Sequence, residues 1–177
     1  MAYDTFTRNG WDVQWVNRYG HYQLSHYHPK THEVMVVVSG PGTIRWGAAD
    51  LDNDAEKHTY GDAYEQDCLQ FDVDVGDVFV IPAGVAHKSF DVRSKDLDVV
   101  GLTGGSGHWV EAQDPRRAVG ELRLSGFTMM GAYPKGNGWS WGTGGDDLGD
   151  FEGVWNLPNP ETDPVVGGHG GIGRYWG

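Results

Sequence analysis

Short stretches of alternating hydrophobic and polar residues recur along the chain. The clearest is Leu69–Val75, in which Leu, Phe and Val alternate with Gln and Asp. Strict alternation puts the apolar side chains on one face of an extended strand, so it predicts a half-buried strand. Further segments rich in Val, Trp, Tyr and Phe are also predicted to be strands: Trp11–Val16, Glu33–Val38, Thr43–Trp46, Val78–Ile81, His87–Asp91, Asp96–Leu102 and Phe127–Ala132.

Glycine and proline separate these segments. Gly40-Pro41-Gly42 lies between two predicted strands and Pro82-Ala83-Gly84 between another two, as expected of tight turns. Many short strands joined by such turns are typical of a β-sandwich or a β-barrel. The pattern therefore predicts an all-β protein.

Two stretches interrupt the strand pattern. Residues 48–65 are rich in Asp, Glu and Ala, and we predict a long loop there. Residues 104–120 contain Asp114-Pro115, and we predict a short helix or an irregular excursion.

The C-terminal part has a different composition. Residues 131–177 hold 14 of the 28 glycines together with Trp139, Trp141, Trp155 and Trp176. Glycine at this density disfavours regular structure, whereas four tryptophans disfavour disorder. We expect this segment to wrap around the barrel, or around a neighbouring subunit, in an extended form.

Size and charge narrow the possible partners. A chain of 177 residues is expected to form one domain, and its net charge of −12 repels nucleic acid. The segment Met1–Gly10 lacks the apolar centre of a signal peptide, and the longest apolar run, Val34–Val38, is too short to cross a bilayer. We expect a cytoplasmic protein without nucleic-acid or membrane partners.

Cys68 is the only cysteine, so the chain cannot form an internal disulfide. This is consistent with a reducing compartment. We interpret Cys68 as a packed or loop thiol and not as a nucleophile.

Candidate metal ligands lie in two parts of the chain. His26 and His28 are two residues apart, so on an extended strand their rings project from the same face. Glu33 begins the next apolar segment, and His87 opens the segment that follows a turn. Three imidazoles and one carboxylate form a donor set suited to Fe, Mn, Ni, Cu or Zn, and much less to Mg or Ca.

The first group of residues resembles cupin motif 1, G(X)5HXH(X)3-4E(X)6G. Gly20, His26, His28, Glu33 and Gly40 occupy its defined positions.

The second group resembles cupin motif 2, G(X)5PXG(X)2H(X)3N. Gly76, Pro82, Gly84 and His87 match, and Asp91 stands where the family usually has Asn. That departure leaves the ligand positions untouched. A subgroup of single-domain cupins found in bacteria and fungi is also similar to this chain, in the segments His26–Glu33, Gly131–Pro134 and Asp163–Val165.

The resemblance implies a single cupin barrel, that is, a double-stranded β-helix or jelly roll. It divides the chain into a cupin β-barrel domain at residues 1–134 and a Gly- and Trp-rich extension at residues 135–177, with motif 1 at 20–40 and motif 2 at 76–91. It also implies one divalent transition metal ion (Fe, Mn, Ni, Cu or Zn), held by His26, His28, Glu33 and His87.

His32 is an alternative to Glu33, because adjacent strand residues face opposite ways and only one of the two is expected to point inward. The spacing of the family motif favours Glu33. The remaining histidines are interpreted as surface or satisfied core residues: His21, His58, His108 and His169.

A fold does not by itself define a reaction, and cupins include several classes of enzyme and binding protein. Our leading interpretation is a metal-dependent, dioxygenase-like oxidoreductase that acts on a small organic molecule. The alternatives are a non-redox Lewis-acid cupin (isomerase, dehydratase or decarboxylase) and a metal- or small-molecule-binding cupin without catalysis. Tyr22, Tyr27 and Lys30 flank the ligands and are candidates for supplying a proton or steering an anion. The Trp-rich C-terminal segment favours a homodimer.

Overall fold

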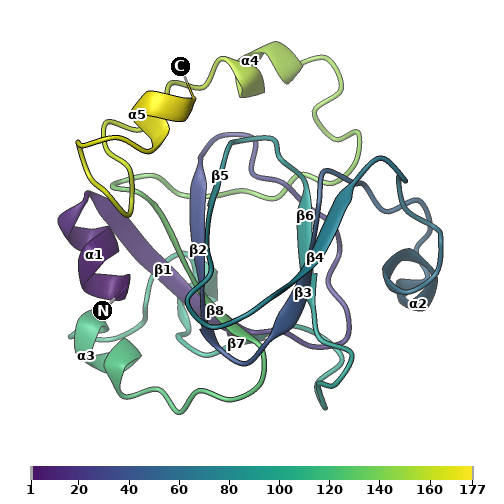
Figure 1. Ribbon diagram of the computed structural model, residues 1–177, viewed down its shortest axis with the longest axis horizontal. Helices are drawn as coiled ribbons and strands as arrows, with labels where there is room; N and C mark the ends of the chain where they lie inside the picture. Colours follow the sequence, from purple (N-terminus) through teal and green to yellow (C-terminus); the bar gives the residue numbers. More distant parts are fainter. Residues whose placement is uncertain (1, 177) are drawn as a thin grey trace.

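The computed structural model describes residues 2–176 and contains two antiparallel sheets that face each other across a common interior (Figure 1). The strands are β1 Trp11–Arg18, β2 Glu33–Ser39, β3 Gly42–Trp46, β4 Leu69–Val73, β5 Val78–Ile81, β6 His87–Phe90, β7 Val100–Gly101 and β8 Thr128–Pro134. The larger sheet has the order β5-β2-β8-β1-β7 and the smaller one β4-β3-β6. The predicted all-β fold is confirmed, although the two sheets form separate hydrogen-bonded ladders.

Strand β2 is apolar on both of its faces. Met35 and Val37 belong to the cluster between the sheets, whereas Val34 and Val36 belong to a second cluster on the outer face of the large sheet. A strand that is covered on both faces carries apolar side chains at successive positions. This explains the continuous apolar run in the sequence.

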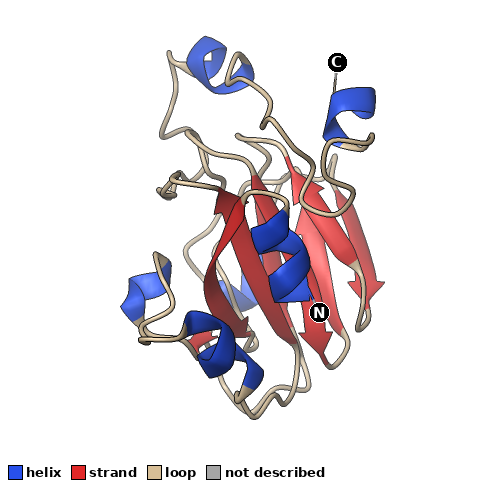
Figure 2. Ribbon diagram, turned by 90° about the vertical axis from the view of Figure 1, so that its left-hand side faces the viewer, coloured by secondary structure: helices blue, strands red, loops and turns tan. Residues whose placement is uncertain are grey.

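Helices α1 (Ala2–Arg8), α3 (Pro115–Gly120) and α5 (Ile172–Tyr175) pack on the outer face of the large sheet. The chain also contains α2 Ala55–Thr59 and α4 Phe151–Trp155, with a 3-10 turn η1 at Gly105–Gly107. Phe6 of α1 and Ile172 of α5 pack with Trp11 of β1 in the outer cluster, and Figure 2 shows α1 lying against this sheet. Within residues 2–176, none of the helices is long and apolar enough to cross a membrane.

The segment 48–65 is not a loop throughout, because it contains α2. The carboxylate of Asp54 accepts hydrogen bonds from the backbone N–H groups of Glu56 and Lys57 and so caps the helix. The short helix predicted within 104–120 is confirmed as α3, with Asp114 as its N-cap and Pro115 in its first turn.

The strand predicted at Asp96–Leu102 is wrong for most of its length, since only Val100–Gly101 pairs with β1. The backbone carbonyls of Asp96 and Leu97 instead accept hydrogen bonds from the N–H groups of His21 and Tyr22. These bonds take the place of a strand ladder.

Strand β4 is less buried than its alternation predicts. Leu69 and Phe71 are 69% and 45% exposed, and only Val73 is buried. Directly opposite residues of an antiparallel pair share one face, and Leu69 and Phe71 lie opposite Trp46 and Ile44. The two side chains therefore face the interior, but at an edge strand where the two sheets are not joined.

The C-terminal segment is not extended throughout, since it contains α4 and α5. Figures 1 and 2 show these two helices lying over one end of the barrel. The segment is fixed to the chain's own first strand, because the Trp11 indole N–H donates to the carbonyl of Thr162 at 2.9 Å. Asn9 donates its side-chain N–H to the carbonyl of Pro164, also at 2.9 Å.

Candidate metal centre

Four side chains gather at one end of the interior. His26 and His28 lie in the connection between β1 and β2, Glu33 is the first residue of β2, and His87 is the first residue of β6. His26 and His87 pair directly through two backbone hydrogen bonds of 3.0 and 2.8 Å. One ligand atom from each of the three histidines lies within 4.8 Å of the other two, and all three rings are buried.

Backbone carbonyls fix the orientation of each imidazole. The Nδ1 atom of His26 donates to Leu24 at 3.1 Å, that of His28 to Ser140 at 2.8 Å, and that of His87 to Val85 at 3.1 Å. A hydrogen bond at Nδ1 fixes the tautomer in which Nε2 is unprotonated and free to bind a metal ion.

Glu33 lies against the same three rings and is 2% exposed. Its Oε2 is 3.2 Å from the Nε2 of His87, and its Oε1 is 3.5 Å from the Nε2 of His28. Oε2 is buried without a hydrogen-bond partner among the described residues. A buried carboxylate oxygen needs a partner, and a metal ion would satisfy it, so the donor set fits a metal.

Charge and burial set the protonation of these groups. Burial acts to raise the pKa of the Glu33 carboxyl, but the neighbouring His28 and His87 hold that pKa well below its ordinary value. Burial, together with His87, lowers the pKa of His26 well below its ordinary value. Glu33 and His26 are therefore in the protonation states that a metal ion requires.

Tyr133 on β8 supports Glu33 from within the interior. Its hydroxyl donates to Oε1 of Glu33 and accepts a hydrogen bond of 2.9 Å from the indole N–H of Trp15. The indole ring of Trp15 packs directly over Gly131 of β8. A side chain at position 131 would collide with this ring, because even a β-carbon would not fit. The segment Gly131–Pro134 is similar to a cupin subgroup, but the sequence patterns did not predict that Tyr133 contacts Glu33, 100 positions away.

Two tryptophans of the C-terminal segment cover the histidines. Trp141 stacks on His26, with the ring centroids 3.8 Å apart and the planes 4° apart. Trp139 lies 5.5 Å from the His28 ring. The backbone N–H of each of Gly142 and Tyr27 donates to the carbonyl of the other. These two bonds hold this part of the C-terminal segment against the residues that carry His26 and His28.

His32 lies on the other side of β2. Its Nδ1 accepts a hydrogen bond of 3.0 Å from the backbone N–H of Ala83, and its Nε2 donates to the carbonyl of Pro158 at 3.2 Å. Both ring nitrogens of His32 are thus used, and its ring lies 5.2 Å from that of Trp176.

The three candidate proton donors point elsewhere. The hydroxyl of Tyr22 donates to Glu56 at 2.8 Å, and that of Tyr27 donates to Asp147 at 2.7 Å. Burial and the Asp147 carboxylate raise the pKa of Tyr27 to about 12. Lys30 is exposed. These placements do not support catalytic roles for the three residues, and Tyr133 is the tyrosine in contact with Glu33.

Comparison with known proteins defines the family. Residues 15–120, more than half of the chain, match the cupin family. The chain therefore belongs to the cupin family, and the resemblance seen in the two motifs is confirmed.

Individual relatives do not add an activity. The chain is 32% identical over 105 residues to a curated relative from Bacillus subtilis (strain 168), "Uncharacterized protein YjlB", and the match covers 59% of this chain and 52% of YjlB. The chain thus spans about half the length of this relative. A solved structure of vicilin from Capsicum annuum aligns with a TM-score of 0.36 and 16% identity, covering 81% of this chain and 27% of vicilin.

Proposed function

We propose that this chain is a metal-dependent cupin oxidoreductase of the dioxygenase type that acts on a small organic molecule. In this proposal His26, His28, Glu33 and His87 hold one divalent transition metal ion. The observation that carries the proposal is the arrangement of three buried histidines that could hold a metal ion, with their Nδ1 atoms already bonded to backbone carbonyls. Such a group leaves three Nε2 atoms for one ion.

The ion, when bound, would supply Lewis-acid or redox chemistry. The protein's own residues have separate tasks. Tyr133 keeps its hydroxyl proton on the Glu33 side and orients that carboxylate. Trp139 and Trp141 exclude water from the histidines, which strengthens the electrostatic interactions in the site.

An apolar cavity of 370 Å³ supports a small, apolar or aromatic substrate. Trp46 and Ile81 line it, and they lie directly opposite His87 and Glu33 in their strand ladders. The described residues that line the cavity carry no charge. An open apolar groove of this kind favours a substrate with an apolar or aromatic part.

Metal analysis of the purified full chain tests the metal site. We expect about one Fe, Mn, Ni, Cu or Zn per chain, and loss of most of it in His28→Ala and His87→Ala. His108→Ala is the matched control, because His108 stacks on Trp139 at 4.2 Å without belonging to the three-histidine group. Unchanged metal content in both ligand variants would refute the assignment.

Oxygen uptake tests the reaction class. Catechol serves as an aromatic probe and a 1,3-diketone as an enolic probe, both with the metal-loaded protein. Oxygen consumption that disappears with His87→Ala supports the dioxygenase type. Zinc as the native metal, together with no oxygen uptake, would instead favour the non-redox class of isomerases, dehydratases and decarboxylases.

We also propose a homodimer in the cytoplasm, as the sequence predicts. The contacts of Trp139 and Trp141 with the chain's own histidines mean that these two residues no longer argue for a second subunit. The support that remains is exposed aromatic surface on α4, where Trp155 is 79% exposed. Light scattering at micromolar concentration measures the mass of the protein in solution. A monomer mass would refute the proposed homodimer.

A further inference from the structure

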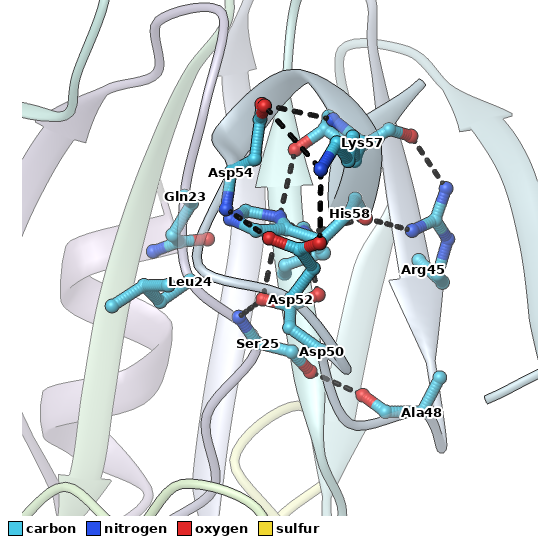
Figure 3. A network of polar contacts seen from close by, with 12 residues as sticks. Gln23, Leu24, Ser25, Arg45, Ala48, Asp50, Asp52, Asp54, Lys57 and His58 are labelled. Atoms are coloured by element: carbon cyan, nitrogen blue, oxygen red, sulfur yellow. Dashed lines mark hydrogen bonds and ion pairs between the residues drawn. The ribbon is translucent and has the colours of Figure 1, made fainter. Parts of the chain in front are cut away.

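Asp50 bridges the two chain segments that carry His26 and His87, and Figure 3 shows it close to Ser25 and His58. Its Oδ2 accepts a hydrogen bond of 2.7 Å from the backbone N–H of Ser25. Its Oδ1 accepts one of 2.8 Å from the ammonium group of Lys88. Ser25 precedes His26 and Lys88 follows His87, so a single carboxylate binds the neighbours of both histidines.

The pairing of the two segments explains this arrangement. His26 and His87 form a directly paired antiparallel bridge, which places Ser25 opposite Lys88. Successive strand residues face opposite ways, so the histidines point into the barrel and Lys88 points out of it. Asp50 therefore contacts this pair of segments from the outer side.

Lys88 is fully buried, at 0% exposure. Its ammonium group donates to Asp50, to the Nδ1 of His58 at 2.7 Å and to the carbonyl of His58 at 3.1 Å. All three donors are thus used. A buried ammonium group is stable only with a partner of opposite charge, so Lys88 and Asp50 hold each other in place.

Arg45 attaches the same segment to the small sheet at a second point. It lies directly opposite Lys88 in the β3–β6 ladder, where two like charges would repel each other. Its guanidinium donates to the carbonyls of His58 at 2.8 Å and Thr59 at 2.7 Å, at the end of α2, and lies 3.5 Å from the Tyr64 ring. The segment 48–65 therefore supplies partners for both buried cations, and Arg45 also donates to the side chain of Gln70 on β4 at 2.8 Å.

We propose that Asp50 is a positioning residue for the metal centre, which it supports from behind His26 and His87. The inference rests on the proposed metal site. Groups behind metal ligands fix the orientation of those ligands, and their loss typically weakens metal binding about 10- to 100-fold. Asp50 acts on both ligands together, because it fixes the outer side of the bridge that they form.

The test uses the full chain and Co²⁺ as the probe metal. Asp50→Asn offers only one oxygen, so either Ser25 or Lys88 loses its acceptor. Lys88→Met removes the charged partner but leaves the Ser25 contact, and it serves as the second variant should Asp50→Asn fold poorly. Asp54→Ala is the control, because it removes the cap of α2 in the same segment without touching Ser25 or Lys88.

We expect Co²⁺ affinity, measured by competition with a chelator, to fall about tenfold or more in both variants, with altered d–d absorption bands. Asp54→Ala should keep the wild-type affinity and spectrum. In the wild type, amide hydrogen exchange at Ser25 should slow when Co²⁺ binds, because the metal and Asp50 restrain the same bridge.

Three results would overturn the inference. The first is wild-type affinity and spectrum in both variants, and the second is an equal loss in Asp54→Ala. The third is unchanged Ser25 exchange on metal binding. A wild-type chain that binds no Co²⁺ would instead refute the proposed metal site itself, so the two failures are distinct.

Discussion

Tyr133 donates its hydroxyl hydrogen bond to Oε1 of Glu33, so a residue of β8 holds the first residue of β2 in the barrel interior. The same hydroxyl lies 3.5 Å from the Nε2 of His28. Within residues 2–176, this contact leaves Oε2 of Glu33 as the carboxylate oxygen without a hydrogen bond. The carboxylate is therefore oriented before any metal ion binds.

Replacing Tyr133 by Phe should weaken metal binding about tenfold, because Glu33 loses its orienting donor and the Trp15 indole N–H loses its acceptor. A chelator titration measures the effect. Tyr19→Phe is the control, since Tyr19 is a second fully buried tyrosine of the same interior cluster. Equal affinity in the two variants would show that the Tyr133 hydroxyl does not matter.

Metal occupancy should fall as the pH drops through the range in which imidazole titrates. Only neutral histidine binds metal, and its ordinary pKa is 6.5. Burial acts to lower the pKa of His28, but Glu33 outweighs it and the net pKa is raised. Protons therefore compete for His28 already above pH 6.5, whereas His26, with its lowered pKa, stays neutral in more acidic solution.

Equilibrium dialysis at fixed total metal between pH 8 and pH 3 measures this loss. His28→Gln lacks one of the three imidazole ligands, so its metal content should be low throughout this pH range. Full occupancy of the wild type at pH 3 would contradict a three-histidine site.

Local sequence patterns predicted which side chains of the candidate metal centre come together, for physical reasons. A spacing of two residues orients His26 and His28 alike, and the structure brings both beside Glu33 and His87. Richness in Val, Trp, Tyr and Phe identified most of the strands, including the continuous apolar run of β2, whereas period-two alternation was clearest in β4, which is mostly exposed. Alternation failed at Leu69, whose face is buried only where a neighbouring strand covers it.

Contacts between residues that are far apart in the sequence could not be predicted from local sequence patterns. Tyr133 and Asp50 each contact residues that are far away in the sequence, and although Tyr133 lies in the segment Gly131–Pro134 that is similar to a cupin subgroup, nothing there indicated its contact with Glu33. The four tryptophans did indicate that the C-terminal segment is ordered. Composition did not reveal that Trp141 stacks on His26, because that depends on how the segment folds back.

Replacing Trp141 by Ala should speed the loss of metal to a chelator. Aromatic stacking is worth about 0.5–1.5 kcal/mol, which corresponds to a rate about two to ten times higher, and the His26 ring would become accessible to water. Stopped-flow chelation measures the rate. Trp155→Ala is the control, because Trp155 stacks on Phe151 and not on a histidine. Identical rates in the two variants would rule out a shielding role for Trp141.

Replacing His32 by Ala should leave metal content unchanged but loosen the C-terminal segment. His32 bonds to the backbone of Ala83 and Pro158, so its loss leaves two backbone groups without their partner. Each lost bond costs about 1–3 kcal/mol when the remaining group stays buried. Thermal unfolding should show a lower midpoint, and limited proteolysis should cut earlier near residue 158.

Glu33→Gln is the counterpart to this variant, because it keeps the size of the side chain and removes its charge. It should lose metal while the C-terminal segment stays as protected as in the wild type, since Glu33 contacts the histidines and Tyr133 instead. The two variants therefore have opposite expected results. Loss of metal in His32→Ala, with retention in Glu33→Gln, would reverse the assignment and make His32 the fourth ligand.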